Sequence, residues 1–486
     1  MATIALPTDR ALALELLLNR LLWPVPLARW KAARGVRDLI ENPETRAAST
    51  DALLAALERA ELESDVCTLL TILLMVGKAA LPDLARVRER IQHPSILAEV
   101  MLQATYDEIG GTAWWRAHSG PVSSTFAPSS YFERHQTHHV PVVLSSNLAS
   151  LERKSGLPFV RQWAYEWQQL CDRIKAEFTE YPYYFGDFGD VRDGIIGQFS
   201  PRQSEVYRSA YLRTFSIAVA EWGFEQREAG FYVSELLPSI RGLFELDPLG
   251  RPPWLKDSPE LCVEDPDQFE SILRAMIASQ PDNDQALVSL YVPLDATVER
   301  YGALRLSAHL VTTDFSLGSE FPREPTDILL AHRSFAIDQE RPDTPIETSL
   351  QAGQTGDALP VCSAIFPIPF GYWQAHLHSA GIPIPARYML PGYARVRGER
   401  DRIAVDSDHR EVAATRYWQD HWSPNYPRNE GHTRCGTWTL MERQLLESQA
   451  SVLGRKIAWS ARLQTWRREK DYGEFMHAER SLFFMM

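Results

Sequence analysis

Two histidine clusters in this sequence have spacings that could hold a metal ion. His135, His138 and His139 lie within five residues, and imidazoles three apart on a helical turn can share one zinc ion. His376 and His378 are two residues apart, so on a strand both rings would lie on one face. Neither cluster has an evident third protein ligand, which catalytic zinc requires. We therefore interpret both as polar surface or hydrogen-bonded core histidines.

A histidine and a cysteine near the C-terminus could form a general base and a nucleophile. His432 and Cys435 are three residues apart, and an imidazole beside a thiolate can activate it for attack. Catalytic cysteine and histidine residues are, however, more often distant in sequence. We expect both residues to be structural, and a metal-dependent or Cys/His-dependent hydrolase stays open as an alternative function.

The segment from residue 181 to residue 194 combines aromatic rings with carboxylates. Asp187, Asp190 and Asp193 offer oxygens that hard cations bind, but their spacing departs from the EF-hand pattern, so we interpret them as turn and capping residues. Five rings in eight residues carry too much apolar area to remain in water. We expect these rings to dock on helices of this chain or on a partner. The predicted partner-binding residues are Tyr181, Tyr183, Tyr184, Phe185 and Phe188.

Motifs that identify common reaction classes are absent. The sequence has no G-x-x-x-x-G-K-[ST], G-x-G-x-x-G, G-x-S-x-G or H-E-x-x-H, so NTPases, dinucleotide-dependent enzymes, α/β-hydrolases and zincins lack support. We predict no cofactor. The chain has 50 basic and 63 acidic residues, a net charge of −13, whereas nucleic-acid binding needs a basic face. A nucleic-acid-binding component is the less favoured alternative.

Cysteine usage and the N-terminus favour a cytoplasmic protein. The five cysteines are widely spaced and odd in number, which is poor material for a disulfide framework, so we expect reduced thiols. Asp9 and Arg10 interrupt any apolar run that a signal peptide would need. The most apolar stretch, residues 66–76, is too short to cross a bilayer. We therefore expect no membrane association.

Helices separated by prolines are predicted throughout residues 1–110. Helix pairs begin near residues 9, 44 and 82, and the turn Trp23-Pro24-Val25-Pro26 separates the first two helices. Pairs that recur every 35 to 45 residues are typical of stacked α-solenoids, and this region resembles HEAT-like repeats. That resemblance implies a stack of helix pairs with a concave surface for a partner. An irregular helical bundle is the alternative.

Capping residues predict where several helices begin and end. Ser64 or Asp65 is expected to cap the apolar helix at residues 66–76, and Ser95 the helix that follows it. The sequence Ser200-Pro201-Arg202-Gln203 forms a capping box with proline in the first turn, and Gly223 is placed to end that helix. A further helix is expected over residues 226–237.

Composition divides the remaining chain into three predicted parts. Residues 111–155 are rich in Gly, Ser and Pro, which indicates a linker or a long loop. Residues 156–250 are predicted to form a helical domain. Residues 251–486 alternate with period two at 286–292, 303–311 and 455–466, and a hairpin is expected over 403–414. We predict an α+β multidomain protein with a mostly antiparallel C-terminal sheet.

A second resemblance concerns function. The segment 199–222, the Trp-Pro-Val-Pro turn and residues 436–455 look like parts of large bacterial conflict or antiphage proteins, in which HEAT-like helices accompany an effector or NTPase part. Because the chain lacks a P-loop, the resemblance implies the non-NTPase portion. We expect a non-enzymatic interaction, scaffold or sensor component of a bacterial multi-protein system, with antiviral defence implied by the resemblance. Its expected partner is another protein or a second copy of the chain.

Overall fold

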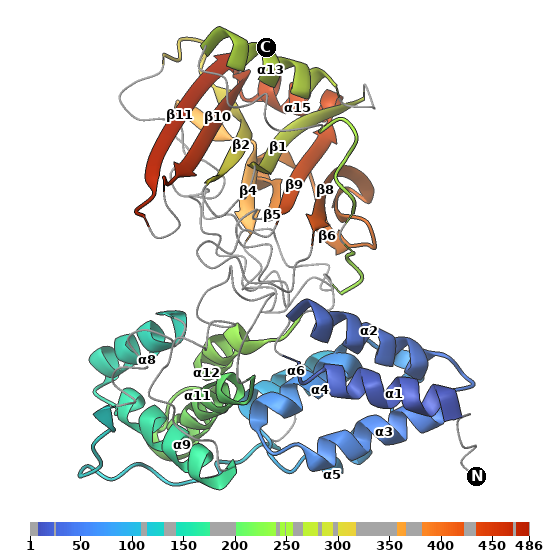
Figure 1. The fold of residues 1–486 in the computed structure, drawn as a ribbon, viewed down its shortest axis with the longest axis vertical. Coiled ribbons are helices and arrows are strands. Elements are labelled where there is room, and N and C mark those ends of the chain that lie inside the picture. Colours follow the sequence, from blue (N-terminus) through green and yellow to red (C-terminus); the bar gives the residue numbers. More distant parts are fainter. Residues whose placement is uncertain are drawn as a thin grey trace. The chain divides into compact units, whose positions relative to one another are not determined.

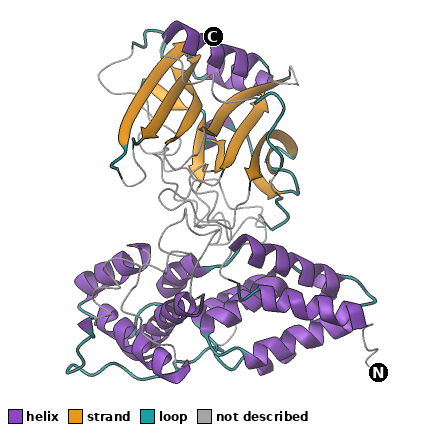
Figure 2. Cartoon of the chain, viewed as in Figure 1, coloured by secondary structure: helices purple, strands orange, loops and turns teal. Residues whose placement is uncertain are grey.

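The computed structural model separates the chain into two compact units, one ending at Phe244 and the next beginning at Glu245. Figure 2 shows that one part of the molecule consists of helices, whereas the other combines strands with helices. The predicted α+β class is confirmed. The boundaries predicted at residues 110, 155 and 250 stay predictions. The described residues are 8–23, 26–107, 114–130, 142–174, 201–239, 244–247, 249–255, 266–279, 284–294, 300–316, 357–365, 382–421, 434–469 and 473–485.

Six α-helices lie in the region for which helix pairs were predicted (Figure 1). Helices α1, α3 and α5 contact one another in sequence along one layer, and α2, α4 and α6 do so along another. A short 3-10 helix, η1 (Lys78–Ala80), connects α4 to α5. The helices are α1 (Thr8–Arg20), α2 (Pro26–Glu41), α3 (Arg46–Arg59), α4 (Glu63–Met75), α5 (Leu84–Arg90) and α6 (Ile96–Tyr106).

The helix caps follow the sequence prediction at one site and depart from it at another. The Ser95 hydroxyl accepts a hydrogen bond from the Ala98 amide and caps α6, as predicted. Helix α4, however, begins before the predicted caps, because its N-cap is Leu62. The Ser64 hydroxyl instead donates to the carbonyl of Glu205 on another helix, at 3.0 Å. A tertiary contact therefore takes the place of the expected local cap.

Helices α9 and α11 connect the rest of the first unit to these layers. Helix α11 packs against α9, α4 and α6, while α8 packs against α9 and α12 against α6. Gly223 adopts a φ of 70° and ends α11 as predicted. The remaining elements of this unit are α8 (Val142–Ser155), α9 (Phe159–Ile174), α11 (Pro201–Trp222), α12 (Gln226–Val233) and the 3-10 helix η3 (Ser234–Leu236).

Helix α8 occupies the end of the segment predicted as a linker or loop. The serines of residues 142–155 favoured the prediction of a loop, because serine prefers caps and turns to helix interiors. Leu144, Leu148 and Leu151 nevertheless lie at helical spacing and are buried. Burial of this leucine face stabilises the helix and outweighs the local preference of its serines.

The second unit contains a large antiparallel sheet whose strands run in the order β11-β10-β2-β1-β9-β8-β7-β6, with β3 paired to β2. Strands β4 and β5 form a separate pair. The predicted antiparallel sheet is confirmed. Its elements are α13 (Pro266–Ala278), β1 (Gln285–Leu294), β2 (Arg300–Val311), β3 (Ala358–Pro360), β4 (Cys362–Ile365), β5 (Ile382–Pro385), η10 (Arg387–Met389), β6 (Ala394–Gly398), β7 (Ile403–Ser407), β8 (Arg410–His421), β9 (Arg434–Glu442), α15 (Arg443–Val452), β10 (Lys456–Arg467) and β11 (Met476–Met485).

A tight hairpin turn and a close contact with the backbone shape this sheet. The predicted hairpin between β7 and β8 turns through Asp408 and His409, which adopt φ values of 47° and 67°. On β9, a Cβ at Gly436 would lie 2.5 Å from both the indole ring of Trp418 and the carbonyl oxygen of Tyr291. Glycine therefore lets the fully buried Trp418 pack directly on the β9 backbone.

The structure bears on two further predictions, that the cysteines are reduced and that no helix crosses a membrane. Cys67, Cys171 and Cys362 are buried free thiols, as predicted for these residues. Burial raises the pKa of the Cys171 thiol to about 12, so it stays protonated. Within the described residues, no helix combines the length and apolarity needed to span a membrane.

Candidate functional site

The site residues predicted from the sequence lie outside the described residues, apart from the backbone of Cys435. Cys435 lies on β9 opposite Gln419 of β8, and its side chain is not described. The predicted metal, catalytic and aromatic partner-binding roles therefore stay predictions. The residues outside the described ranges are His135, His138, His139, Tyr181, Tyr183, Tyr184, Phe185, Asp187, Phe188, Asp190, Asp193, His376, His378 and His432.

A different group of side chains converges inside the first unit. Glu63 lies at the start of α4, His93 in the turn between α5 and α6, and His118 in the segment that precedes α8. One nitrogen or oxygen atom from each of the three lies within 4.8 Å of the others. His118 Nε2 is 3.7 Å from Glu63 Oε1, and the two imidazole rings have centroids 5.3 Å apart. We call these three residues the Glu63 triad.

An arginine from α11 orients the carboxylate of this triad. Arg213 Nε donates to Glu63 Oε1 at 2.7 Å, and Arg213 Nη1 lies 3.8 Å from Glu166 Oε2. Glu166, on α9, accepts hydrogen bonds from the Gln162 side-chain amide and from the Ser119 hydroxyl. The carboxylates and Arg213 are almost completely buried. This network therefore fixes the Glu63 side chain from α9 and α11.

Burial and neighbouring charges set the protonation of the triad. Burial raises the pKa of Glu63, although the charge of Arg213 opposes this shift. Burial, followed by the charge of nearby arginines, lowers the pKa of His93 and of His118 to about 4. Both imidazoles are therefore neutral at neutral pH, and each has one ring nitrogen without a proton.

The sequence analysis missed this triad because no local motif contains it. Glu63, His93 and His118 come from three segments about 25 to 30 residues apart, and His93 stands beside the Pro94-Ser95 helix start that drew attention instead. Metal-site motifs place their ligands a few residues apart on one helix or loop. The tertiary packing of α4, the α5–α6 turn and the segment at His118 brings the three together.

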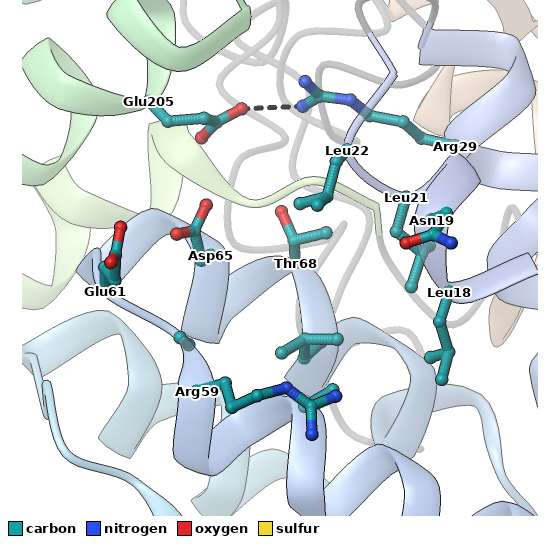
Figure 3. A pocket seen from close by; sticks show the side chains of 13 residues that line it. Leu18, Asn19, Leu21, Leu22, Arg29, Arg59, Glu61, Asp65, Thr68 and Glu205 are labelled. Atoms are coloured by element: carbon teal, nitrogen blue, oxygen red, sulfur yellow. Dashed lines mark hydrogen bonds and ion pairs between the residues drawn. The ribbon is translucent and has the colours of Figure 1, made fainter. Parts of the chain in front are cut away.

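A second feature of the first unit is a hollow of about 520 Å³ beside α1 (Figure 3). Figure 3 shows Leu18, Leu21 and Leu22 along one side and Glu61 and Asp65 along the other. Its lining is therefore apolar on the α1 side and acidic at the start of α4. The complete lining is Leu18, Asn19, Leu21, Leu22, Arg29, Ala56, Arg59, Ala60, Glu61, Asp65, Thr68, Leu69 and Glu205.

Glu205 of α11 links α11 to α2 at the edge of this hollow. Its Oε1 atom accepts hydrogen bonds from Arg29 Nη1 of α2 and Arg208 Nη1 of α11, both at 2.7 Å. Burial alone would raise the pKa of Glu205, but the charges of Arg208 and Arg29 outweigh burial and lower it. Glu205 is therefore ionised at neutral pH and holds the polar rim in place.

Helix α1 and the turn after it expose large apolar side chains next to the hollow. Leu12, Leu16, Leu22 and Trp23 are each 48–56% exposed. Leu12 and Leu16 lie one helical turn apart, and Leu22 also lines the hollow. We call these four residues the α1 apolar surface. Of these four residues, Leu22 brings the surface to the edge of the hollow.

Neither family models nor curated proteins indicate a function for this chain. No family model matches the chain, and no curated protein matches it. The Glu63 triad, the hollow and the α1 apolar surface are therefore interpreted from their own geometry and chemistry.

Proposed function

We propose that this chain is a non-enzymatic protein-interaction component, acting as a scaffold or sensor in a bacterial multi-protein system. The observation that carries the proposal is the α1 apolar surface. Among the described residues, nine large apolar side chains are exposed, and four of them lie within the twelve residues from Leu12 to Trp23. Single exposed apolar residues are ordinary, whereas a contiguous group marks an interaction site.

The hollow beside this surface supports the same function. Binding hot spots consist of a bulky anchor that fills a pocket and is shielded from water by its neighbours. Leu22 borders the hollow, so a partner helix lying on Leu12 and Leu16 could insert an apolar anchor there. The surface fits an amphipathic helix, which presents apolar residues at i, i+4 and i+7.

The packing of the first six helices supports a HEAT-like platform. The odd-numbered helices begin at Thr8, Arg46 and Leu84, a regular spacing of 38 residues. Odd and even helices form separate layers of sequential contacts, as the two layers of a helical-pair solenoid do. Such stacks present extended surfaces to partners. A role in antiviral defence follows from the sequence resemblance and is part of this proposal.

The test compares the α1 apolar surface with exposed apolar residues elsewhere. The full chain, expressed in its native host, is captured together with its partners and quantified by mass spectrometry, and its mass is measured in solution by light scattering. We expect either one stoichiometric partner or a homo-oligomer. The double substitution Leu12→Ser and Leu16→Ser should reduce that complex about tenfold or more without lowering Tm, since both side chains are solvent-exposed.

The matched control is Val452→Ser on α15, a side chain that is 74% exposed. It should leave the complex intact. A monomeric chain without a stoichiometric partner would contradict the proposal. So would a complex that survives the double substitution with unchanged affinity, because another surface would then hold it.

A further inference from the structure

We propose that Glu63, His93 and His118 form a binding site for one divalent transition-metal ion, and that Zn²⁺ is the ion it fits best. The site shares no residue with the α1 apolar surface and does not depend on the proposed interaction function. Two imidazoles and one carboxylate are a common three-ligand set for zinc. The separation of the donor atoms, their unmet hydrogen-bonding capacity and the surrounding charges support the assignment.

The donor atoms are spaced nearly as a bound ion would hold them. Two ligands at a tetrahedral Zn²⁺ ion, with bonds of about 2.0–2.1 Å, are about 3.3 Å apart. His118 Nε2 and Glu63 Oε1 are 3.7 Å apart, and the chosen atoms of all three residues fall within 4.8 Å. Small side-chain rotations would therefore bring the three donors into one coordination sphere.

Two buried acceptor atoms at this point have no hydrogen-bond partner among the described residues. They are Glu63 Oε2 and His118 Nε2. The ring of His118 is hydrogen-bonded to the backbone of Pro94, which can only accept, so Nδ1 carries the proton and the Nε2 lone pair points toward the triad. Unmet buried acceptors are costly. A cation between them would satisfy both atoms.

The contacts around the triad resemble the second layer of a metal site. Histidine ligands usually donate their other N–H to a carbonyl, and ligand carboxylates are usually hydrogen-bonded in turn. Here Pro94 accepts from His118, while Arg213 donates to Glu63 Oε1, and Glu63 Oε2 has no hydrogen-bond partner among the described residues. The carboxylate and one imidazole are therefore oriented before any ion binds.

Nearby arginines decide which ions can bind. Arg213 lies 2.7 Å from Glu63, and Arg173 Nη1 lies 3.5 Å from His93 Nδ1. These positive charges oppose any cation, so the site needs ions that form strong bonds to imidazole. Zn²⁺ and its transition-metal neighbours do so, whereas Mg²⁺ and Ca²⁺ prefer several oxygen ligands. We therefore expect no binding of Mg²⁺ or Ca²⁺.

The ion would tie together three segments that are distant in sequence. Glu63 begins α4, His93 belongs to the α5–α6 turn, and His118 belongs to the segment at residues 114–121. Because such a site does not form in an unfolded chain, metal binding stabilises the fold. Three protein ligands leave one coordination position for water or for a group from a partner.

The first experiment measures Zn²⁺ binding to the full chain after chelator treatment, by calorimetry with zinc chloride. We expect one ion per chain and a rise in Tm. The substitutions His93→Gln and His118→Gln should each weaken binding about tenfold or more, since even second-layer changes cost 10–100-fold. The control His477→Gln removes an exposed histidine of β11 and should bind as the unaltered chain does.

A second experiment needs no variant and so does not depend on the folding of the substituted chains. Hydrogen exchange of the unaltered protein, with and without zinc chloride, should show slower exchange at the start of α4, at the α5–α6 turn and at residues 114–121. Exchange in the β10–β2 pair should stay unchanged. X-ray absorption of the zinc-loaded protein should show imidazole ligands.

A third variant tests the charge argument. Arg173→Met removes a positive charge and a competing hydrogen-bond donor from His93, so it should bind Zn²⁺ several-fold more tightly. The proposal is overturned if the unaltered chain binds no Zn²⁺. It is equally overturned if both histidine variants bind as tightly as the control, or if zinc changes hydrogen exchange only outside the three segments.

Discussion

The two units of the molecule differ in whether their charged side chains are buried or exposed. The helical unit buries many ionisable side chains in its interior, whereas the described part of the sheet unit buries Arg468 and keeps its ion pairs partly exposed. Arg397 and Arg402, for example, pair with Asp406 and Glu411 on strands β6 to β8 while remaining about 30% exposed. The buried charged residues of the helical unit are Arg29, Arg37, Glu63, Asp65, Glu99, Glu166, Glu205, Arg208, Arg213 and Glu235.

This difference indicates what each unit needs in order to fold. Strand pairing satisfies the backbone of the sheet unit, and its apolar faces supply the driving force, so charge can stay at the surface. The layers of the helical unit are joined through polar groups, as in the contacts of Arg29 with Glu205 and of Arg213 with Glu63. Buried pairs add little net stability but penalise any arrangement that separates them. The helical unit is therefore the more sensitive to loss of a single charge.

The largest effect is expected from Arg213→Met. The substitution leaves Glu63 and Glu166 buried without their shared cation, and removing one partner of a buried pair costs about 3–5 kcal/mol. Urea denaturation followed by far-UV circular dichroism should show early loss of helical signal. Arg227→Met, at an exposed position of α12, is the control and should change little. A loss below about 1 kcal/mol would show that the buried charge pairs of the helical unit contribute no more to stability than surface pairs do.

Glu205→Gln should have the next largest effect and should change the response to pH. The pKa of Glu205 is lowered in the folded protein, so its contribution to stability is present above the ordinary pKa of 4.5 and is lost as pH falls through the lower folded value. The variant should be less stable by about 2–3 kcal/mol at neutral pH. It should also lose less stability than the unaltered chain on acidification. Denaturation at pH 7 and below pH 4.5 measures both, and an unchanged acid response would contradict the assignment.

A smaller effect is expected in the sheet unit from Gly436→Ala. The added Cβ would meet the Trp418 ring and the Tyr291 carbonyl at 2.5 Å, and overpacking of this kind costs about 1–3 kcal/mol. Gly250→Ala is the control, because no atom lies within 4 Å of the position of its Cβ. Tryptophan fluorescence during denaturation reports the transition. Equal stability of the two variants would mean that Trp418 can shift without cost.

The smallest effect is expected from Arg402→Gln on the sheet surface. Arg402 pairs with Glu399 at 2.8 Å and with Glu411 at 3.0 Å, but all three side chains are partly exposed. Pairs of this kind contribute about 0.2–1 kcal/mol, and salt screens them. Denaturation at low and high ionic strength should show that the small difference disappears in salt. A loss as large as that of Arg213→Met would remove the distinction between the two units.

Local patterns were sufficient for the first six helices and for some of the strands, whereas strands β3 to β6, β9 and β11 were not predicted individually. Proline-separated apolar periodicity predicted the helices of the N-terminal region, and two-residue alternation predicted β1, β2, β10 and the β7–β8 hairpin. These signals work because a helix or strand repeats its buried face every few residues. Helix α8 was not predicted, because its serines are typical of loops although its leucines form a buried face. The ten-residue α15, between two strands, was not predicted either.

The sequence by itself determined the N-terminal helices, several strands and the antiparallel character of the C-terminal part, because those choices depend on residues within a few positions of one another. The tertiary structure alone decided the Glu63 triad, the pairing of Glu205 with Arg29, and the exposure of Leu12 and Leu16. Glu205 and Arg29 are 176 residues apart, and no local periodicity links them. Such contacts form only when separate helices pack, since burial and charge pairing depend on which surfaces meet.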